Sequence, residues 1–365
     1  MDLQKLKSKA FDRLSAYVPG EQPQDLKGWI KLNTNENAYE PPTQFMEEYK
    51  ARIGERLRAY PDPNALVLRK TILEDFLIPE YNAMATPRSI ICGVGADEIL
   101  DILFKAFIDE GDTIITFQPS YGMYDVLAKT YQATTKVVRF REDFTLPEIS
   151  DIPAEGKLLI LCSPNNPTGI RFPNSEIQAI CKHFKGLVIV DEAYTDFSTE
   201  TALSLLHTTK NLVIVRTFSK SFSLAGIRLG YAQASPEIIA LLDTIRLPIN
   251  IPFPTQLAGI LAIKHKEHFK KQNQLIIQER EKMSAALNAL DNISVVPSEA
   301  NFILIQIPTL DLVPKVLQRL KDQKILIRHY NVPGCEQYLR MTIGTPEQNA
   351  VFLQAFQRII TEITA

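Results

Sequence analysis

The chain has 365 residues, of which 45% are hydrophobic and 22% charged, and its formal net charge is −2. This length and composition are typical of a globular protein with one large and one smaller domain. The near-neutral charge argues against nucleic acid or an anionic membrane surface as a partner. No run approaches the ~20 apolar residues of a membrane span, and the first residues contain no signal-peptide core. We therefore expect a cytoplasmic protein with neither nucleic acid nor membrane as a partner.

The cysteines and histidines give no indication of a metal site. Two histidines lie three residues apart in KHKEHFKK (264–271), a segment that favours a solvated charged helix face over metal ligation. Four cysteines are widely separated, without metal-ligand or Cys-x-x-Cys spacing: Cys92, Cys162, Cys181 and Cys335. The pattern predicts free thiols in a reducing compartment and no bound metal.

The first three-fifths of the chain alternate between apolar runs and amphipathic segments. Residues 1–42 are rich in Pro and Asn and weakly periodic, so we expect an N-terminal arm that packs on the smaller domain and the active site. Strands are then predicted at 89–95, 113–117, 157–163, 186–190 and 211–215, with helices at 96–109, 124–131 and 174–184. This alternation predicts an α/β domain over 43–250, with a mostly parallel sheet flanked by helices on both faces.

The remaining residues, 251–365, follow a different pattern. After the proline-rich PINIPFP (248–254) comes one long helical stretch from about 255 to 290. Strands are predicted at 301–307, 325–330 and 338–343, and helices at 312–323 and 346–363. We expect a smaller α+β domain here.

Polar segments follow several predicted strands of the large domain. They are GVGADE (93–98), PSYGMY (119–124), SPNNPTG (163–169) and DEAYTDF (191–197). In open parallel sheets, ligands bind at the carboxyl ends of the strands. A helix N-terminus can hold an anion, an aromatic ring can stack on a planar group, and Asn and Asp can pair with ring substituents. Each segment also has a purely structural explanation, as a helix start, a seam or a rigid turn.

The segment 211–231, NLVIVRTFSKSFSLAGIRLGY, adds a candidate nucleophile. Its apolar run reads as a buried strand that ends beside Lys220, and burial lowers the pKa of a lysine amine. Nearby hydroxyls and Arg228 suit a phosphate, although strand-end cations are often only solvated. Together with the other strand-end segments, this set matches what pyridoxal 5'-phosphate (PLP) needs, including a Schiff-base lysine.

The motifs SPNNPTG, DEAY, TFSKSFSLAGIRLGY and LRMTIGTPEQN, in this order and spacing, resemble those of the fold-type-I PLP-dependent aminotransferases. The third motif is most similar to that of the histidinol-phosphate subgroup. The resemblance covers nearly the whole chain and implies a homodimer with shared sites.

Site roles follow from this resemblance, position by position. Lys220 would bind PLP as a Schiff base and act as the base, Asp191 would pair with the ring nitrogen, and Tyr194 would donate to the ring oxygen. The other implied cofactor contacts are Asn166 at the same oxygen, Tyr121 stacked on the ring, Ala96, Asp97, Thr217, Ser219 and Arg228 at the phosphate, and Tyr60 reaching the neighbouring subunit's phosphate. The implied substrate contacts are Arg340 for a carboxylate, and Arg328 and Tyr17 for a substrate phosphate.

The resemblance implies transfer of an amino group from histidinol phosphate to 2-oxoglutarate, which gives imidazole acetol phosphate and glutamate. An aromatic amino acid aminotransferase on the same skeleton is the nearest alternative, and a decarboxylase of a phosphorylated amino acid is another. A binding or regulatory protein that has lost catalysis would lack the lysine or the ring-nitrogen acid. Both Lys220 and Asp191 are present.

Overall fold

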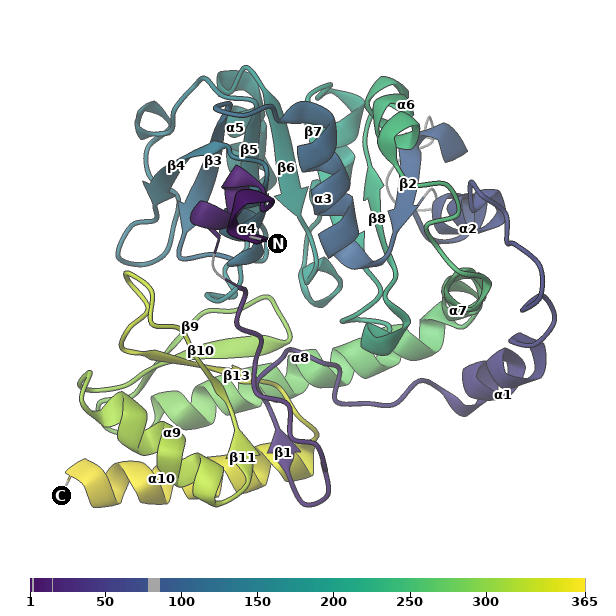
Figure 1. The fold of residues 1–365 in the computed structure, drawn as a ribbon. Coiled ribbons are helices and arrows are strands. Elements are labelled where there is room, and N and C mark those ends of the chain that lie inside the picture. Colours follow the sequence, from purple (N-terminus) through teal and green to yellow (C-terminus); the bar gives the residue numbers. More distant parts are fainter. Residues whose placement is uncertain (2, 15, 78–85, 365) are drawn as a thin grey trace.

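The computed structural model describes residues 1, 3–14, 16–77 and 86–364, and the elements below are those of these residues. Figure 1 shows two lobes, one built on a large sheet and the other on a small sheet, with the long helix α8 and the N-terminal segment connecting them. No helix in these ranges has the length and apolar character needed to cross a bilayer. All four cysteines are buried and unpaired.

The large sheet has seven strands in the order β2-β8-β7-β6-β5-β3-β4. Their bounds are β2 Ile90–Gly93, β3 Thr113–Gln118, β4 Thr134–Arg139, β5 Leu158–Cys162, β6 Leu187–Asp191, β7 Leu212–Thr217 and β8 Gly230–Gln233. The strands β7, β6, β5, β3 and β4 run parallel, whereas β8 is antiparallel to both of its neighbours. The predicted mostly parallel α/β sheet is confirmed, although β4 and β8 were not predicted.

Helices cover both faces of this sheet, as its strands require. Strands β5, β6 and β7 are almost fully buried, which is typical of parallel strands covered on both sides. One face packs against α3 (Gly95–Phe107), α4 (Met123–Thr130) and α6 (Pro236–Ile245). The other face packs against α1 (Thr43–Arg52), α2 (Leu66–Thr71), α5 (Asn174–His183) and α7 (Phe253–Lys264).

The second lobe has its own apolar core and its own sheet. The sheet is antiparallel, in the order β12-β13-β10-β9, and helices α8, α9 and α10 pack around the core. The bounds are α8 Lys266–Asn288, β9 Ser294–Val296, β10 Phe302–Gln306, α9 Leu312–Asp322, β11 Ile325–Leu326, β12 Arg328–His329, β13 Tyr338–Thr342 and α10 Pro346–Thr364. The described residues also form one π-helix (Ile72–Leu77) and short 3₁₀ helices at Leu3–Lys5, Lys9–Asp12, Pro87–Ser89, Ile149–Asp151, Thr195–Phe197, Ala202–His207 and Ala225–Ile227.

Two predicted elements of this part of the chain were wrong in detail. The single helix expected over 255–290 is two helices, α7 and α8, which meet at His265. The break is tertiary in origin, because α7 packs on the large sheet while α8 continues into the second lobe. The single strand expected over 325–330 is two short strands, β11 and β12, which belong to different sheets.

The N-terminal segment contacts both lobes. Its strand β1 (Ile30–Lys31) pairs in parallel with β11. The Leu32 carbonyl accepts a hydrogen bond from the Thr342 N–H at 2.9 Å. Residues 33–37 follow β1 and reach the loop after β7, where Asn37 Nδ2 donates a hydrogen bond to the Lys220 carbonyl at 2.9 Å.

Candidate active site

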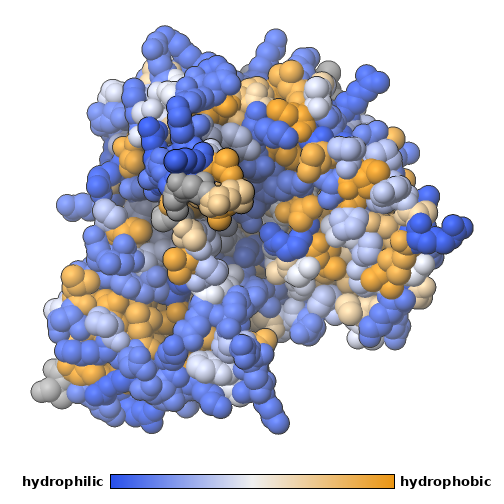
Figure 2. All heavy atoms as spheres, in the orientation of Figure 1, coloured by the Kyte–Doolittle hydropathy of each residue, from blue (hydrophilic) through white to orange (hydrophobic). Residues whose placement is uncertain are grey.

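A cavity of about 490 Å³ lies between the two lobes and the N-terminal segment, and Figure 2 shows the hollowed surface in this region. The cavity is lined by every predicted site residue except Tyr60: Tyr17, Ala96, Asp97, Tyr121, Asn166, Asp191, Tyr194, Thr217, Ser219, Lys220, Arg228, Arg328 and Arg340. Among the described residues, no group of His, Cys, Asp or Glu is arranged to hold a metal ion.

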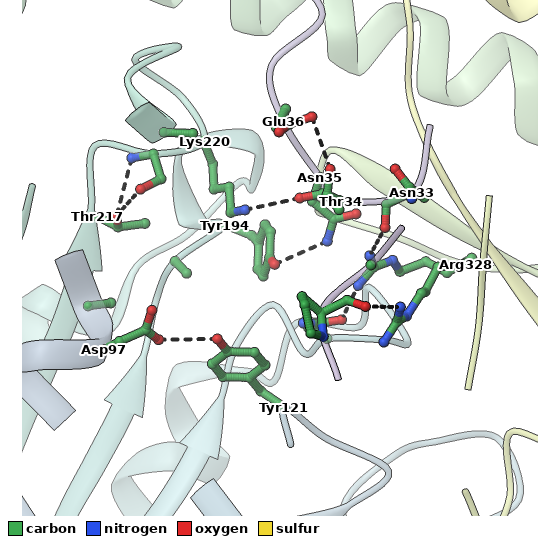
Figure 3. Close-up of a pocket in the computed structure, with 18 of the residues that line it drawn as sticks. Asn33, Thr34, Asn35, Glu36, Asp97, Tyr121, Tyr194, Thr217, Lys220 and Arg328 are labelled. Carbon is green, nitrogen blue, oxygen red and sulfur yellow. Dashed lines mark hydrogen bonds between the residues drawn. The ribbon is translucent and has the colours of Figure 1, made fainter. Parts of the chain in front are cut away.

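Lys220 follows the buried strand β7 and points its amine into the cavity (Figure 3). Its Nζ donates a hydrogen bond of 3.4 Å to the carbonyl oxygen of Thr34. Burial, together with the positive charge of Arg340, lowers the pKa of the Lys220 amine to about 8. A substantial fraction of this amine is therefore neutral near physiological pH and available as a nucleophile or base.

Asp191 ends the neighbouring strand β6 and is buried. One carboxylate oxygen accepts a hydrogen bond from the Tyr124 hydroxyl at 2.7 Å, and the other accepts from the Ala193 N–H at 3.1 Å. Burial raises the pKa of Asp191 to about 6, while these two hydrogen bonds act in the opposite direction. The carboxylate remains mostly ionised at pH 7 and is placed to pair with a cation.

The start of α3 is shaped for close approach of an anion. Gly95 has φ +78°, and a Cβ there would lie 2.6 Å from the Arg228 guanidinium. A Cβ on Gly230 would lie 2.5 Å from the backbone nitrogen of Ala96. The two glycines thus keep side-chain atoms away from the positive end of a 13-residue helix.

Polar side chains surround the start of α3 at this end of the cavity. Arg228 donates to Asp97 Oδ2 at 3.3 Å and to Ser219 Oγ at 3.4 Å. The Thr217 hydroxyl donates to Ser219 Oγ at 2.9 Å. An arginine, two hydroxyls and free N–H groups at a helix start are the donor set that a phosphate prefers.

Tyr121 and Tyr194 lie between Asp97, at the start of α3, and Arg328 of the second lobe (Figure 3). The Tyr121 hydroxyl donates to Asp97 Oδ1 at 3.1 Å, and the Tyr17 ring meets the Tyr121 ring edge-on at 6.1 Å between centroids. The Tyr194 hydroxyl accepts from Asn35 Nδ2 at 3.1 Å, so its own proton is free for another acceptor.

The arginines of the small sheet enter from the opposite lobe. Arg340, on β13, is buried and donates to Asn166 Oδ1 at 2.6 Å, to the Tyr330 hydroxyl at 2.6 Å and to the Asn33 carbonyl at 2.8 Å. Its Nε is buried without a hydrogen-bond partner among the described residues. Arg328, on β12, donates to the backbone carbonyls of Val18 and Pro19 at 2.9 and 3.0 Å.

Sequence reasoning missed several side chains of the site. Tyr124 lies in PSYGMY, three residues after Tyr121, and its ring meets the Tyr121 ring edge-on at 5.6 Å between centroids, although Tyr121 precedes α4. Tyr330 and Asn35 gave no local signal, because their partners come from distant parts of the chain.

Tyr60 is not brought to the cavity within this chain. Its side chain is 83% exposed and lies outside the cavity lining. A contact from Tyr60 to a cofactor would have to be made in another subunit.

Comparison with known proteins identifies relatives over nearly the whole chain. A histidinol-phosphate aminotransferase of Geotalea uraniireducens is 39% identical over 352 residues, which cover 96% of this chain and 98% of that protein. A protein of the same name from Geobacter sulfurreducens is 38% identical over 351 residues, covering 95% and 97%.

Solved structures share the fold at lower identity. Histidinol-phosphate aminotransferase from Sinorhizobium meliloti, solved in complex with pyridoxal-5'-phosphate, superposes with a TM-score of 0.86 at 20% identity, over 98% of each chain. L-Threonine-O-3-phosphate decarboxylase from Porphyromonas gingivalis superposes with a TM-score of 0.78 at 23% identity, over 91% of this chain and 99% of that one. The fold alone therefore does not select one reaction. Residues 27–356 match the family aminotransferase class I and II, and the chain belongs to that family.

Proposed function

We propose that this protein is a PLP-dependent aminotransferase that transfers the amino group of histidinol phosphate to 2-oxoglutarate, as a step of histidine biosynthesis. The observation that carries the proposal is the composition of one cavity. The large sheet contributes the Lys220 amine and the Asp191 carboxylate, and the small sheet contributes the Arg328 and Arg340 guanidinium groups. The names of the curated relatives support the same substrate.

The residues present fit PLP. The cradle at Gly95 leaves room for a phosphate beside the N–H groups of Ala96 and Asp97 and the Arg228 guanidinium. Asp191 is a buried carboxylate suited to a protonated pyridine nitrogen. The other proposed contacts are Thr217 and Ser219 at the phosphate, Tyr121 stacked on the ring, and Asn166 and Tyr194 at the ring oxygen.

When bound, PLP supplies an aldehyde that condenses with amines and a ring that accepts the electrons of a broken Cα–H bond. The Lys220 amine, partly neutral because of its lowered pKa, would take the proton from the substrate Cα and carry it to the cofactor side. Asp191 would hold the ring nitrogen protonated, so that the ring can accept negative charge. The Tyr194 hydroxyl, whose oxygen is held by Asn35, would donate its proton to the ring oxygen.

The two substrates carry different anions. Histidinol phosphate has a phosphate and no carboxylate, whereas glutamate has two carboxylates. The planar fork of an arginine pairs with either group. Arg340 is assigned to the carboxylate next to the reacting carbon, and Arg328 with Tyr17 to the phosphate.

The same proposal extends to assembly and location. The exposure of Tyr60 supports a homodimer in which this side chain reaches the phosphate of the neighbouring subunit's cofactor. We retain the division into an arm (1–42), a large PLP-binding domain (43–250) and a small domain (251–365), in a cytoplasmic enzyme.

A comparison of substrates tests the assignment. With 2-oxoglutarate as acceptor, kcat/KM for histidinol phosphate is expected to exceed that for phenylalanine or tyrosine at least about 100-fold, because charged donors left unpaired in the site penalise a neutral side chain. The reverse order would select the aromatic aminotransferase. Release of CO₂ from a phosphorylated amino acid, without amino transfer, would select a decarboxylase.

A further inference from the structure

Tyr330, which the sequence did not predict as a site residue, lies beside both Arg328 and Arg340. Tyr330 follows β12 directly and lines the cavity. Its ring centroid lies 5.4 Å from Cζ of Arg328 and 5.1 Å from Cζ of Arg340. Both guanidinium groups are therefore within cation–π distance of one aromatic ring.

The strand register explains why these two charges need a spacer. Arg328 and Arg340 are directly opposite each other in the antiparallel β12–β13 pair. Like charges at such positions repel, since directly opposite Cβ atoms lie roughly 4.5–5.5 Å apart. A ring that attracts both cations offsets this repulsion and holds the two guanidinium groups apart.

The two arginines depend on Tyr330 to different degrees. Arg340 is also fixed by Asn166 and by the Asn33 carbonyl. Arg328, within the part of the chain that the structure describes, is held by the Tyr330 ring and by two arm carbonyls. Loss of the ring therefore affects the position of Arg328 more than that of Arg340.

The Tyr330 hydroxyl has a separate role. It accepts a hydrogen bond from Arg340 Nη1 at 2.6 Å, and a phenol that accepts in this way keeps its own proton for donation. The hydroxyl thus adds a neutral donor beside two cations. Such a set suits a ligand with two separated anionic groups.

We propose that Tyr330 is a specificity-determining positioning residue, which holds Arg328 apart from Arg340 so that the cavity prefers ligands with an anionic group at each end. The assignment of the two anions to the two arginines rests on the proposed function. The preference itself is a binding property that is measured without turnover.

The test measures the dissociation constants of two unreactive ligands by calorimetry on the PLP-loaded enzyme. Glutarate has a carboxylate at each end, and 3-phenylpropionate has one carboxylate and a neutral end. Tyr330→Leu is expected to weaken glutarate about tenfold and 3-phenylpropionate less than about twofold, because only the distal cation is displaced. Tyr330→Phe keeps the ring and is expected to retain most of the preference for glutarate.

Tyr338→Leu is the matched control, because Tyr338 lies on the same sheet but outside the cavity lining. If Tyr330→Leu does not fold, Tyr330→Met makes the same comparison. An unchanged ratio of the two dissociation constants, or an equal loss for both ligands, would overturn the proposal. If wild-type enzyme fails to use histidinol phosphate while the ratio still collapses in Tyr330→Leu, then the proposed substrate is wrong and the role of Tyr330 stands.

Discussion

The two sides of the cavity are built in different ways. On the side of the large sheet, Asp191 and Lys220 lie at or just beyond the carboxyl ends of β6 and β7, which pair directly. On the other side, Arg340 bonds the carbonyl of Asn33, which is 307 positions away in the chain. One side is thus assembled from strand-end motifs, and the other from contacts between the arm and the small sheet.

The two sides also differ in electrostatics. The reactive groups of the large sheet have shifted pKa values, about 8 for Lys220 and about 6 for Asp191, and burial is the main cause of both shifts. Arg340 is a cation with three hydrogen-bond acceptors. The contrast supports our proposal, in which proton transfer is assigned to the large-sheet side and recognition of the substrate's anionic groups to the small-sheet side.

Removing the Lys220 amine is expected to have the largest effect on the large-sheet side of the cavity. Lys220→Ala is expected to lower kcat at least about 10⁴-fold, because it deletes both the nucleophile and the base. It should also abolish the absorbance band of the lysine-bound cofactor. The exposed Lys210→Ala serves as a control and should retain activity. Substantial transamination by Lys220→Ala would remove this residue from the proposed mechanism.

Removing a guanidinium group tests the recognition side. Arg340→Ala is expected to lower kcat/KM at least about 100-fold for glutamate, since hydrogen bonds to charged groups are worth about 1.5–3 kcal/mol each. The loss for histidinol phosphate is expected to be smaller, because this substrate has no carboxylate next to the reacting carbon. Arg340→Lys keeps the charge and loses the fork, so an intermediate loss is expected. A change near twofold in steady-state kinetics would place Arg340 outside the site.

The lowered pKa of Lys220 predicts that the rate of PLP binding on the large-sheet side of the cavity depends on pH. A cofactor-free enzyme is expected to bind PLP about 50-fold faster at pH 8 than at pH 6, because the neutral fraction of an amine with a pKa near 8 rises about tenfold per pH unit and then levels off. Stopped-flow absorbance measures this rate, and Lys220→Ala corrects for reaction at other lysines. A rate that still rises steeply between pH 9 and 10 would indicate an unperturbed amine.

Sequence reasoning succeeded where chemistry follows a buried strand. Asp191 and Lys220 could be placed together because the carboxyl ends of parallel strands share one edge. It failed for β4, whose residues TTKVVR are mostly exposed and show no apolar run, and for β8, which is short and begins with Gly230. Neither strand has the local pattern on which a prediction depends.

The recognition side was predictable only through resemblance. Arg328 and Arg340 became candidates because their motifs match a family, whereas their partners Tyr330 and Asn33 are set by strand register and by the path of the arm. The break at His265 has the same origin, since helix-forming residues flank it on both sides and only packing on two different lobes separates α7 from α8.

Substitution of Tyr124 is expected to have the smallest effect on activity, because Tyr124 acts only through Asp191. Its hydroxyl bonds the carboxylate at 2.7 Å and opposes the effect of burial, so Tyr124→Phe should raise the pKa of Asp191 above its present value near 6. The carboxylate would then be less ionised at neutral pH. We expect kcat to fall about tenfold and the acidic limb of the pH profile to move to higher pH.

Tyr131→Phe is the matched control for this variant, because it removes a similar tyrosine–aspartate hydrogen bond, to Asp101 at 2.9 Å, outside the cavity lining. A purely structural role for Tyr124 predicts equal loss of thermal stability in both variants and no movement of the acidic limb. Movement of that limb in Tyr124→Phe alone would show that the large-sheet side is tuned by a hydrogen bond from α4, one layer behind the cavity. The reactivity of the groups on the large-sheet side would then depend on packing within the large lobe alone. Recognition of the substrate's anionic groups, in our proposal, depends on the contact between the two lobes.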